Sequence, residues 1–296
     1  MSTIDYIVSR LTPIYSPEEA REIAFWVLEE LTGQDRFTLS ACKDTKNISN
    51  IEIILQRIIK KEPIQYIFGH ILWSGLDLKL TSATLIPRPE TAELVDWITQ
   101  SYNSQLSNLQ TSFNFQLSTF NCLDIGTGSG CIALSLKQHH PAWQVTGIDI
   151  SPEAIAVARK NATRHHLDVT FLEHDIFSFN SILINQPASL NFQLSTFNYD
   201  IVVSNPPYVL ESEKVSMESN VLDYEPSSAL FVPNDDPLLF YRRIAELRLG
   251  RWLYFEINER FGAEVCDLLS SLGYVDIELK RDSYGKERFV RARLAH

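Results

Sequence analysis

The feature that most constrains the fold is a regular alternation of short apolar runs with helix-like segments, from about residue 121 to the end of the chain. Such alternation is typical of a doubly wound, mostly parallel sheet with helices on both faces. We therefore predict an α/β fold with a seven-stranded, mostly parallel sheet. The strand-like runs are Cys122–Ile125, Val145–Ile150, Val169–Leu172, Ile201–Ser204, Arg251–Ile257, Val275–Lys280 and Arg288–Leu294. The helical patterns between them include Cys131–Gln138, Pro152–Arg164, Pro237–Leu247 and Ala263–Leu272.

Residues 1–70 follow a different, purely helical pattern. Ser16 is a typical helix N-cap, Pro17 suits the first helical position, and Glu19 completes a capping-box sequence. Apolar residues then recur at helical spacing, and a second periodic stretch runs from Ile51 to Ile59. We expect a small all-helical domain, which serves either as a plain bundle or as a substrate-recognition module attached to a catalytic domain.

A change of period marks the end of this helical part. Leu76, Leu78 and Leu80 alternate with other residues, which places them on one face of an extended chain. We assign residues 71–86 to a short β-hairpin linker, and residues 87–296 to the α/β domain.

The charge and the cysteines argue against several functional classes. The formal net charge is −11, with 37 acidic and 26 basic side chains, which argues against binding a nucleic acid by neutralising its phosphates. The cysteines lack metal-ligand or redox spacing, and the chain begins without a signal peptide and holds no run long enough to span a membrane. We expect a cytoplasmic monomer with reduced thiols, with no metal and with no direct contact to nucleic acid or membrane.

The tetrapeptide Asn205-Pro206-Pro207-Tyr208 directly follows the strand Ile201–Ser204. Neither proline can donate a ladder hydrogen bond and each fixes its own φ, so the strand must end here in a rigid elbow. Open α/β sheets bind ligands at this carboxyl end of their strands. The Asn205 side-chain oxygen and the Pro206 carbonyl can both accept hydrogen bonds from a planar NH2 group, with Tyr208 covering it. The pattern predicts a site that presents an NH2 group to an electrophile; a proline-terminated strand without chemistry is the alternative.

A glycine-rich segment, Leu123–Gly130, ends the first strand and opens a helix. Its spacing is G-x-G-x-G rather than the G-x-G-x-x-G of dinucleotide sites, and an acid lies inside the strand. An acid in this place repels a diphosphate and suits a cationic sulfonium or amino group. The cofactor-binding candidates are Asp124, Gly126, Thr127, Gly128 and Gly130.

Two further acids follow the next two strands. Asp149 ends the second strand, where doubly wound folds hold a ribose diol. Asp175 follows the third strand and is placed to accept a hydrogen bond from an adenine amino group, with an apolar residue packing on the ring. Together the acids predict S-adenosylmethionine, with S-adenosylhomocysteine as the product, rather than a nicotinamide cofactor. The candidates here are Asp149, Ile150, Asp175, Ile176 and Phe177.

An octapeptide, Asn-Phe-Gln-Leu-Ser-Thr-Phe-Asn, occurs twice without change, at residues 114–121 and 191–198. Each copy directly precedes a predicted strand. We interpret both as duplicated loop insertions at the sheet edge remote from the chemistry, with pairing as edge strands as the alternative.

The chain also resembles a known family, the peptide chain release factor N5-glutamine methyltransferases, which are class I S-adenosylmethionine-dependent enzymes with a Rossmann-like fold. Asn-Pro-Pro-Tyr after the fourth strand is shared by class I enzymes that methylate planar NH2 groups. The Pro-Arg-Pro-Glu-Thr segment is the most specific part of the likeness. The other matching segments are residues 62–69, 224–226 with Ala229 and Leu230, and Asp282 with Gly285.

The resemblance implies the substrate, which is the glutamine of the Gly-Gly-Gln motif of release factors, and hence a role in translation termination. It implies catalysis by Asn205, Pro206 and Tyr208, with Asn205 also touching the cofactor. It implies substrate contacts from Asn205, Pro206, Pro207, Tyr208, Arg88 and Glu90. A ribosomal-protein glutamine methyltransferase, an adenine N6 methyltransferase of nucleic acid and a non-catalytic binding module are the alternatives.

Three residues depart from the family pattern. Ala92 stands where the family usually has Glu, and Glu93 is one position further along, which on a helix is a turn of roughly 100°. His174 and Asn258 stand where glycine is usual. All three lie outside the Asn-Pro-Pro-Tyr core, so we expect them to affect supporting contacts rather than the reaction.

Overall fold

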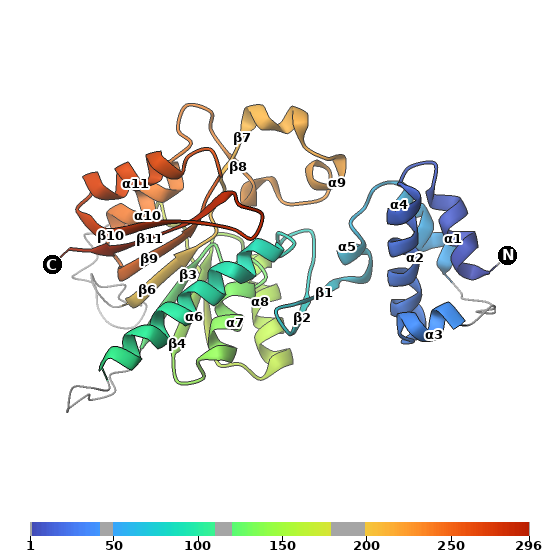
Figure 1. Cartoon of the computed structure of the whole chain (residues 1–296), viewed down its shortest axis with the longest axis horizontal. Coiled ribbons are helices and arrows are strands. Elements are labelled where there is room, and N and C mark those ends of the chain that lie inside the picture. Colours follow the sequence, from blue (N-terminus) through green and yellow to red (C-terminus); the bar gives the residue numbers. More distant parts are fainter. Residues whose placement is uncertain (1, 42–49, 110–119, 179–198, 296) are drawn as a thin grey trace. The chain divides into compact units, whose positions relative to one another are not determined.

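The computed structural model describes residues 2–41, 50–109, 120–178 and 199–295 (Figure 1). It divides the chain into two compact units. One unit comprises Met1–His70 together with the later segment Glu218–Tyr224, and the other comprises Ile71–Met217 and Glu225–His296. The chain therefore passes between the units three times. Among the described residues, no helix is both long and apolar enough to cross a membrane.

The first unit is helical. Its helices are α1 (Thr3–Leu11), α2 (Pro17–Thr32), α3 (Arg36–Ala41), α4 (Ile51–Ile59), α5 (Ile64–Phe68) and α9 (Ser219–Leu222). Apolar residues that recur at helical spacing pack into one core, which includes Ile7, Leu11, Leu28, Leu55 and Ile58. The hydroxyl of Tyr224 donates to the Lys60 carbonyl at 2.9 Å, so the later segment is bound to this unit.

The first turns of α1 and α2 are stabilised differently. As expected, Ser16 caps α2 by accepting from Glu19 N, but the reciprocal bond of a capping box is not formed there. The full capping box forms at α1, between Ser2 and Asp5. Both helices have an acid three residues after the N-cap serine, so spacing alone does not predict which carboxylate accepts from the N-cap backbone N–H.

The second unit is built on a seven-stranded sheet with the order β10-β11-β9-β6-β3-β4-β5. Parallel pairing joins β5, β4, β3, β6 and β9, and β11 is antiparallel to both of its neighbours. All seven predicted strands are confirmed to within two residues at each end. Their bounds are β3 (Asn121–Ile125), β4 (Gln144–Asp149), β5 (Val169–Glu173), β6 (Tyr199–Ser204), β9 (Gly250–Glu256), β10 (Tyr274–Arg281) and β11 (Glu287–Leu294).

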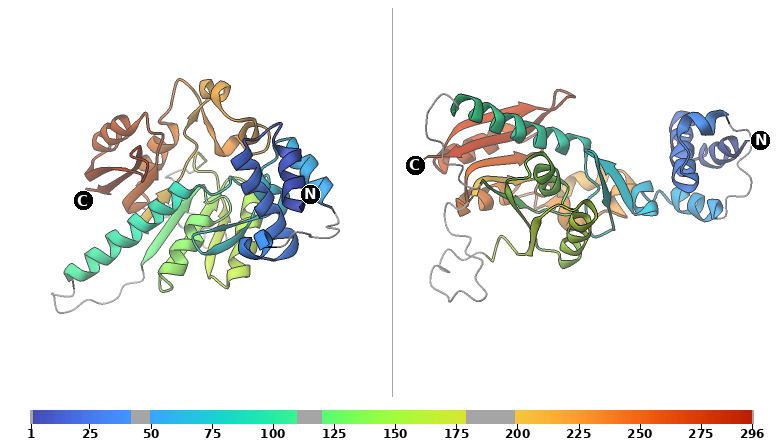
Figure 2. Two further views of the ribbon diagram at one scale, coloured as in Figure 1. Left: turned by 45° about the vertical axis from the view of Figure 1, so that its right-hand side comes forward. Right: turned by 90° about the horizontal axis from the view of Figure 1, so that it is seen from below.

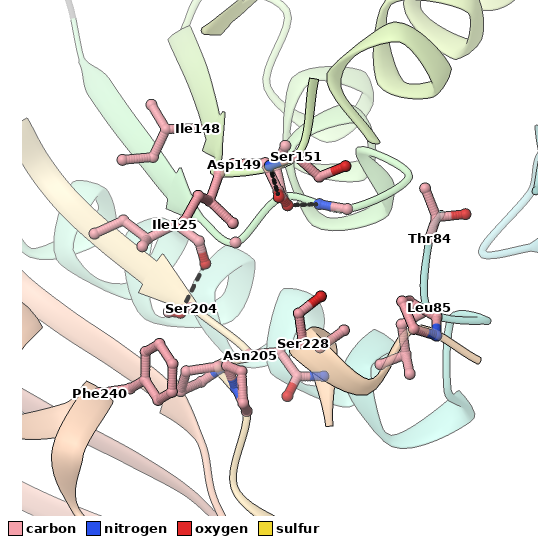
Figure 3. A pocket seen from close by; sticks show the side chains of 18 of the residues that line it. Thr84, Leu85, Ile125, Ile148, Asp149, Ser151, Ser204, Asn205, Ser228 and Phe240 are labelled. Carbon is pink, nitrogen blue, oxygen red and sulfur yellow. Dashed lines mark hydrogen bonds between the residues drawn. The ribbon is translucent and has the colours of Figure 1, made fainter. Parts of the chain in front are cut away.

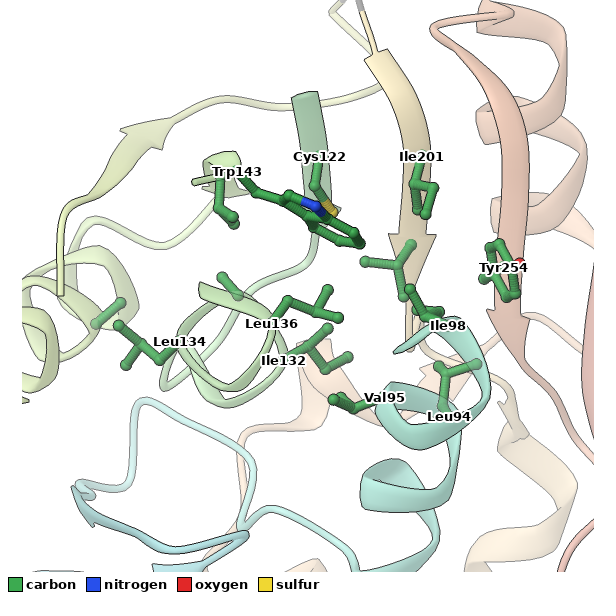
Figure 4. Close-up of a cluster of buried hydrophobic side chains, with 14 of the residues drawn as sticks. Leu94, Val95, Ile98, Cys122, Ile132, Leu134, Leu136, Trp143, Ile201 and Tyr254 are labelled. Carbon is green, nitrogen blue, oxygen red and sulfur yellow. The ribbon is translucent and has the colours of Figure 1, made fainter. Parts of the chain in front are cut away.

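Helices cover both faces of the sheet (Figures 1 and 2). On one face lie α6 (Pro89–Leu109), α7 (Cys131–His139) and α8 (Pro152–His165); on the other lie α10 (Leu239–Leu247) and α11 (Gly262–Ser271). Successive residues of one strand feed opposite cores, which explains why the strands read as continuous apolar runs. Cys122 and Ile201 join the core under α6 and α7 (Figure 4), whereas Leu123 and Val202 join the core under α10 and α11.

Smaller elements connect the main ones. The predicted hairpin is present as β1 (His70–Trp73) and β2 (Leu76–Lys79), with Leu76, Leu78 and Leu80 buried on one face. After β6 the chain forms β7, η2, α9, η3 and β8, of which β7 and β8 pair in parallel. The bounds are β7 (Val209–Leu210), η2 (Glu211–Ser216), η3 (Ser227–Ala229) and β8 (Phe231–Val232).

The duplicated octapeptides lead into adjacent strands. The pairs Cys122–Ile201 and Ile125–Ser204 align β3 with β6 in parallel, so both strands begin at the amino-terminal edge of the sheet. Asn121 N, at the end of the first copy, donates to the Asp200 carboxylate at 2.8 Å. Apart from residues 120 and 121, the two copies lie outside the described residues, so the choice between loops and paired edge strands stays a prediction.

Gly147 lies in the middle of β4, and its packing links the sheet to the glycine-rich loop. A Cβ at this position would lie 2.6 Å from the Phe171 ring and 2.7 Å from the Thr127 hydroxyl oxygen. Only a residue without a side chain fits, because both neighbours are themselves held in place.

Gly147→Ala should therefore lower the stability of the second unit by about 1–3 kcal/mol through overpacking. Scanning calorimetry measures the change. Adding Phe171→Leu, which removes the ring atoms that clash, should recover part of the loss. A melting temperature of Gly147→Ala equal to that of the wild type would contradict this packing.

Candidate active site

A pocket of about 390 Å³ opens at the carboxyl ends of β3, β4, β5 and β6 (Figure 3). This is the point at which the strand order reverses, because the chain runs from β3 outward to β5 and then returns to the other side of β3. The lining comes from residues within the ranges 83–91, 125–132, 148–151, 174–177, 204–207, 226–231 and 240–244.

The glycine-rich loop lines the pocket, and the backbone N–H groups of Gly126, Thr127 and Gly128 are already used. Gly126 N and Thr127 N both donate to the Ile148 carbonyl at 2.9 Å, and Gly128 N donates to Asp149 at 2.9 Å. Gly126 and Gly128 have φ of +73° and +54°, and no atom lies within 4 Å of a Cβ built there. The loop therefore offers a close approach but no ring of free N–H donors for a diphosphate.

Asp149 lies in the pocket wall with its carboxylate fixed by two backbone donors. Gly128 N binds one oxygen and Ser151 N binds the other, each at 2.9 Å (Figure 3). Burial raises the pKa of Asp149, and these two hydrogen bonds oppose the rise. Each oxygen keeps a lone pair, so the group can accept from a pair of hydroxyls, as a ribose diol requires.

The residues proposed for the adenine ring, Ile150, Asp175, Ile176 and Phe177, all line the pocket. Ile150 and Phe177 expose 61% and 43% of their surface, although both are apolar, which indicates faces available to a flat ring. Asp175 accepts from Phe177 N at 2.9 Å through one oxygen, and Ile176 lines the wall beside them. The histidine at 174 belongs to the same lining, and its backbone N donates to the Asp149 carbonyl, as a glycine could also do.

Asp124 is placed differently from the prediction. It is fully buried behind the loop and is not among the residues that line the pocket. One oxygen accepts from the Thr127 hydroxyl at 2.6 Å and from Ala133 N at 3.2 Å, and the other has no hydrogen-bond partner among the described residues. Burial raises its pKa to about 7. Asp124 thus fixes the loop and the start of α7, and reaches a bound cation only through the loop.

Gly130 also lies outside the lining. It has φ of +83° and caps the start of α7, and a Cβ there would lie 3.1 Å from Phe171 and 3.3 Å from Ala158. Its role is close packing of helix on sheet, which is a known use of the last glycine of such loops.

The Asn-Pro-Pro elbow forms the wall opposite the loop. Ser204 Oγ donates to the Ile125 carbonyl at 2.7 Å, which joins the end of β6 to the end of β3. Asn205, Pro206 and Pro207 all line the pocket. The two predicted halves of the site, for cofactor and for NH2 group, are therefore in one pocket.

Tyr208 does not line the pocket, contrary to the prediction that it covers the substrate. Its ring packs against the core under α10, and its hydroxyl donates to Glu256 Oε1 at 3.2 Å. The backbone turns after the second proline, so the side chain points into the protein. Asn258 donates to the Tyr208 carbonyl at 3.1 Å, a contact that a glycine could not make, so this departure from the family pattern supports the elbow.

Arg88 and Glu90 separate in the structure. Arg88 lines the pocket and forms an ion pair with the buried Glu225 at 2.7 Å, and Glu225 also accepts from Ile86 N at 3.2 Å. Glu90 does not line the pocket. The two segments that matched the family near 88 and 225 therefore bind each other, and together they form one wall.

The remaining departure, Ala92, packs partly buried against the core. The neighbouring Glu93 accepts from both the backbone N and the hydroxyl of Ser283, at 3.0 and 2.7 Å, in the turn between β10 and β11. Glu93 is thus bound to the turn between β10 and β11. Within the described ranges, no group of three or more metal-ligating side chains is gathered.

Comparison with known proteins identifies the family of the chain. A methyltransferase-domain model matches residues 117–238. A release factor glutamine methyltransferase of Bacteroides thetaiotaomicron is 43% identical, with 97% of each chain covered, and one of Flavobacterium psychrophilum is 40% identical, with 96% of this chain and 95% of that protein covered. The solved catalytic domain of hMettl16, in complex with an RNA hairpin, superimposes with a TM-score of 0.54 at 16% identity, over 75% of this chain and 76% of that one, which shows the fold alone.

The sheet order and the pocket at its switch point define a class I methyltransferase. Within that class, the near full-length identity places the chain in the family of release factor glutamine methyltransferases.

The pKa of Asp124 gives a pH prediction. Because burial raises it to about 7 from 3.8, the folded state favours the protonated acid. The resulting stability is complete below the unfolded pKa and is lost as the pH rises through about 7. Between pH 5 and 7 the free energy of unfolding of the wild type should fall relative to that of Asp124→Asn, by up to roughly 1.4 kcal/mol per pH unit.

Urea unfolding at a series of pH values measures this slope. The constant cost of burying an asparagine NH2 group shifts the level but not the slope, so two parallel curves would show that Asp124 titrates normally.

Proposed function

We propose that this protein transfers the methyl group of S-adenosylmethionine to the side-chain amide nitrogen of the glutamine in the Gly-Gly-Gln motif of peptide chain release factors. The observation that carries the proposal is the meeting of Asn205 and Pro206 with Asp149 in one pocket. Relatives that match the chain over nearly its full length and are named release factor glutamine methyltransferase support the proposal.

The pocket residues fit S-adenosylmethionine by the chemistry of their donors. The oxygens of Asp149 suit the ribose hydroxyls, Asp175 suits the adenine amino group, and Ile150 and Phe177 suit the ring faces. The glycine-rich loop, with its N–H groups already used, suits a cation better than a phosphate. When bound, this cofactor supplies a methyl group activated by its sulfonium.

The acceptor side must orient a weak nucleophile. The nitrogen of a carboxamide shares its lone pair with the carbonyl, so it reacts only when its lone pair is directed at the methyl group. Asn205 Oδ1 and the Pro206 carbonyl each accept one N–H in the proposed complex. Both bonds strengthen as positive charge develops on the nitrogen, and the proton leaves after transfer. Because the methyl group is already activated, no strong base is needed.

We extend the proposal to the helical unit. A Gly-Gly-Gln tip is too small to provide specificity, so a second surface must bind the release factor. The helical unit includes Glu218–Tyr224, which follows η2 and is followed directly by Glu225, the partner of Arg88. The helical unit is therefore joined through the chain to Glu225, which with Arg88 forms one wall of the pocket.

Asn205→Ala should reduce kcat roughly a hundredfold, because one contact to a developing charge is lost. The Kd for S-adenosylmethionine should stay within a few fold. Turnover with labelled cofactor and calorimetric titration measure the two quantities. Loss of cofactor binding together with turnover would assign Asn205 a structural role instead.

The acceptor is tested with wild-type protein, labelled cofactor and four substrates: release factor, the same factor with the Gly-Gly-Gln glutamine changed to alanine, ribosomal protein and DNA. Label should enter the first alone. Label in ribosomal protein or DNA, with none in the release factor, would replace the proposed substrate.

Deletion of residues 1–70 should raise the KM for the release factor far more than the KM for the cofactor. The retained segment Glu218–Tyr224 would lose its packing partners, so the melting temperature of the remaining unit serves as the control. Equal changes in both KM values would mean that the helical unit only supports folding.

A further inference from the structure

We propose that Thr91 and Glu256 are positioning residues that fix the orientation of the Asn205 amide, so that its oxygen rather than its nitrogen faces the acceptor NH2 group. The inference deepens the proposed function and rests on it. Neither residue was predicted from the sequence.

The three side chains come from distant segments. Thr91 lies in the first turn of α6, Asn205 follows β6, and Glu256 ends β9. Because Ser204 pairs with Phe255 in the parallel register of β6 and β9, the residues that follow them leave the sheet side by side. The start of α6 completes the group, and Thr91 itself lines the pocket.

Hydrogen bonds join the three in a fixed order. Thr91 Oγ1 lies 2.7 Å from Glu256 Oε2, and Asn205 Nδ2 lies 3.2 Å from Thr91 Oγ1. The other carboxylate oxygen, Glu256 Oε1, accepts from the Tyr208 hydroxyl at 3.2 Å. Glu256 thus receives one proton donor on each oxygen, although it is 1% exposed.

Proton counting sets the direction of the chain of bonds. Thr91 Oγ1 donates to Glu256 Oε2, and a hydroxyl has a single proton, so the proton of Thr91 points at Glu256. Only lone pairs of Thr91 are then left for Asn205, and only the NH2 end of the asparagine can use them. The carbonyl end is consequently free to face the pocket as an acceptor.

Both oxygens of Glu256 accept hydrogen bonds, one from Thr91 and one from Tyr208. Burial raises the pKa of Glu256, and these two hydrogen bonds and the charge of Arg288 oppose part of that rise. Arg288 is held at this place by Asp282, at 3.2 Å, and by the Ile257 carbonyl, at 3.3 Å. This gives a function to Asp282, which matched the family pattern but lies outside the pocket lining.

The opposite orientation would be unproductive. An Asn205 amide turned by 180° would present N–H donors to the acceptor NH2 group, which also carries donors. The acceptor nitrogen would lose a hydrogen bond in the transition state, where its charge is greatest. The hydrogen bonds that join Glu256, Thr91 and Asn205 therefore affect the chemical step rather than cofactor binding.

A double-mutant cycle tests this inference. Wild type, Thr91→Val, Asn205→Ala and the double variant are compared in single turnovers with saturating labelled cofactor. Valine keeps the shape of threonine and removes the hydroxyl. Thr91→Val should slow transfer roughly tenfold in the wild-type background. With Asn205 already replaced by alanine, the same change should have less than about a twofold effect, because it acts through Asn205.

Two further variants separate positioning from packing. Thr91→Ser keeps the hydroxyl and should stay within about threefold of the wild-type rate, since the same bonds can form. Thr99 lies on the same helix as Thr91, α6, and its hydroxyl contacts His140 rather than Asn205. Thr99→Val removes this hydroxyl and should leave the rate unchanged. Cofactor affinity and melting temperature are recorded for every variant.

Equal effects of Thr91→Val in both backgrounds, or equal losses in Thr91→Ser and Thr91→Val, would overturn the inference and leave the proposed function intact. If the wild type labels only ribosomal protein or DNA, the proposed substrate is wrong. The double-mutant cycle is then run on that acceptor, because its NH2 group needs the same acceptor oxygen, Asn205 Oδ1. If the wild type labels no acceptor at all, both proposals fail.

Discussion

The parallel pairing of β6 between β3 and β9 is the interaction on which the site depends. Its register carries the glycine-rich loop, the Asn-Pro-Pro elbow and Glu256 to the same edge of the sheet. The bond from Ser204 Oγ to the Ile125 carbonyl closes the gap between two of these strand ends. Both faces of the strands are buried in apolar cores, so a shift of register would require repacking of both helix layers.

Three carboxylates complete the arrangement, of which Asp124 and Glu256 are buried and Asp149 is partly exposed. Asp149 faces the pocket and is held by two backbone donors. Asp124 lies behind the loop, and Glu256 lies behind the elbow, where each orders a neighbouring segment. An acid in a low-dielectric place is costly unless it accepts hydrogen bonds, and the same bonds immobilise the groups that donate them. The protein thus uses buried acids to fix the geometry on both sides of the transferred group.

Much of this could be predicted from the sequence, because local patterns determine it. Strand limits follow from apolar runs, and the place of the pocket follows from the rule that ligands bind where strand order reverses. The directions of Asp124 and Tyr208 could not be predicted in this way. For Tyr208, alternation gives no direction, because the chain turns just after the strand. For Asp124, which lies inside β3, alternation gives the face but not the fact that Thr127 and the start of α7 cover it.

The partners of Asn205 could not be predicted either. Thr91 and Glu256 are 165 positions apart, and only the packing of α6 across the end of β9 brings them together. One signal was present in the sequence, since Glu256 ends a predicted central strand in the same manner as Asp149. An acid that becomes buried at a strand end needs hydrogen-bond or charge partners.

The most direct test of the account is a crystal structure of the protein with S-adenosylhomocysteine and its release factor. We predict the glutamine nitrogen within hydrogen-bonding distance of Asn205 Oδ1 and the Pro206 carbonyl, with the cofactor ribose on Asp149. A glutamine whose nitrogen points away from these two oxygens, or a cofactor outside this pocket, would contradict it.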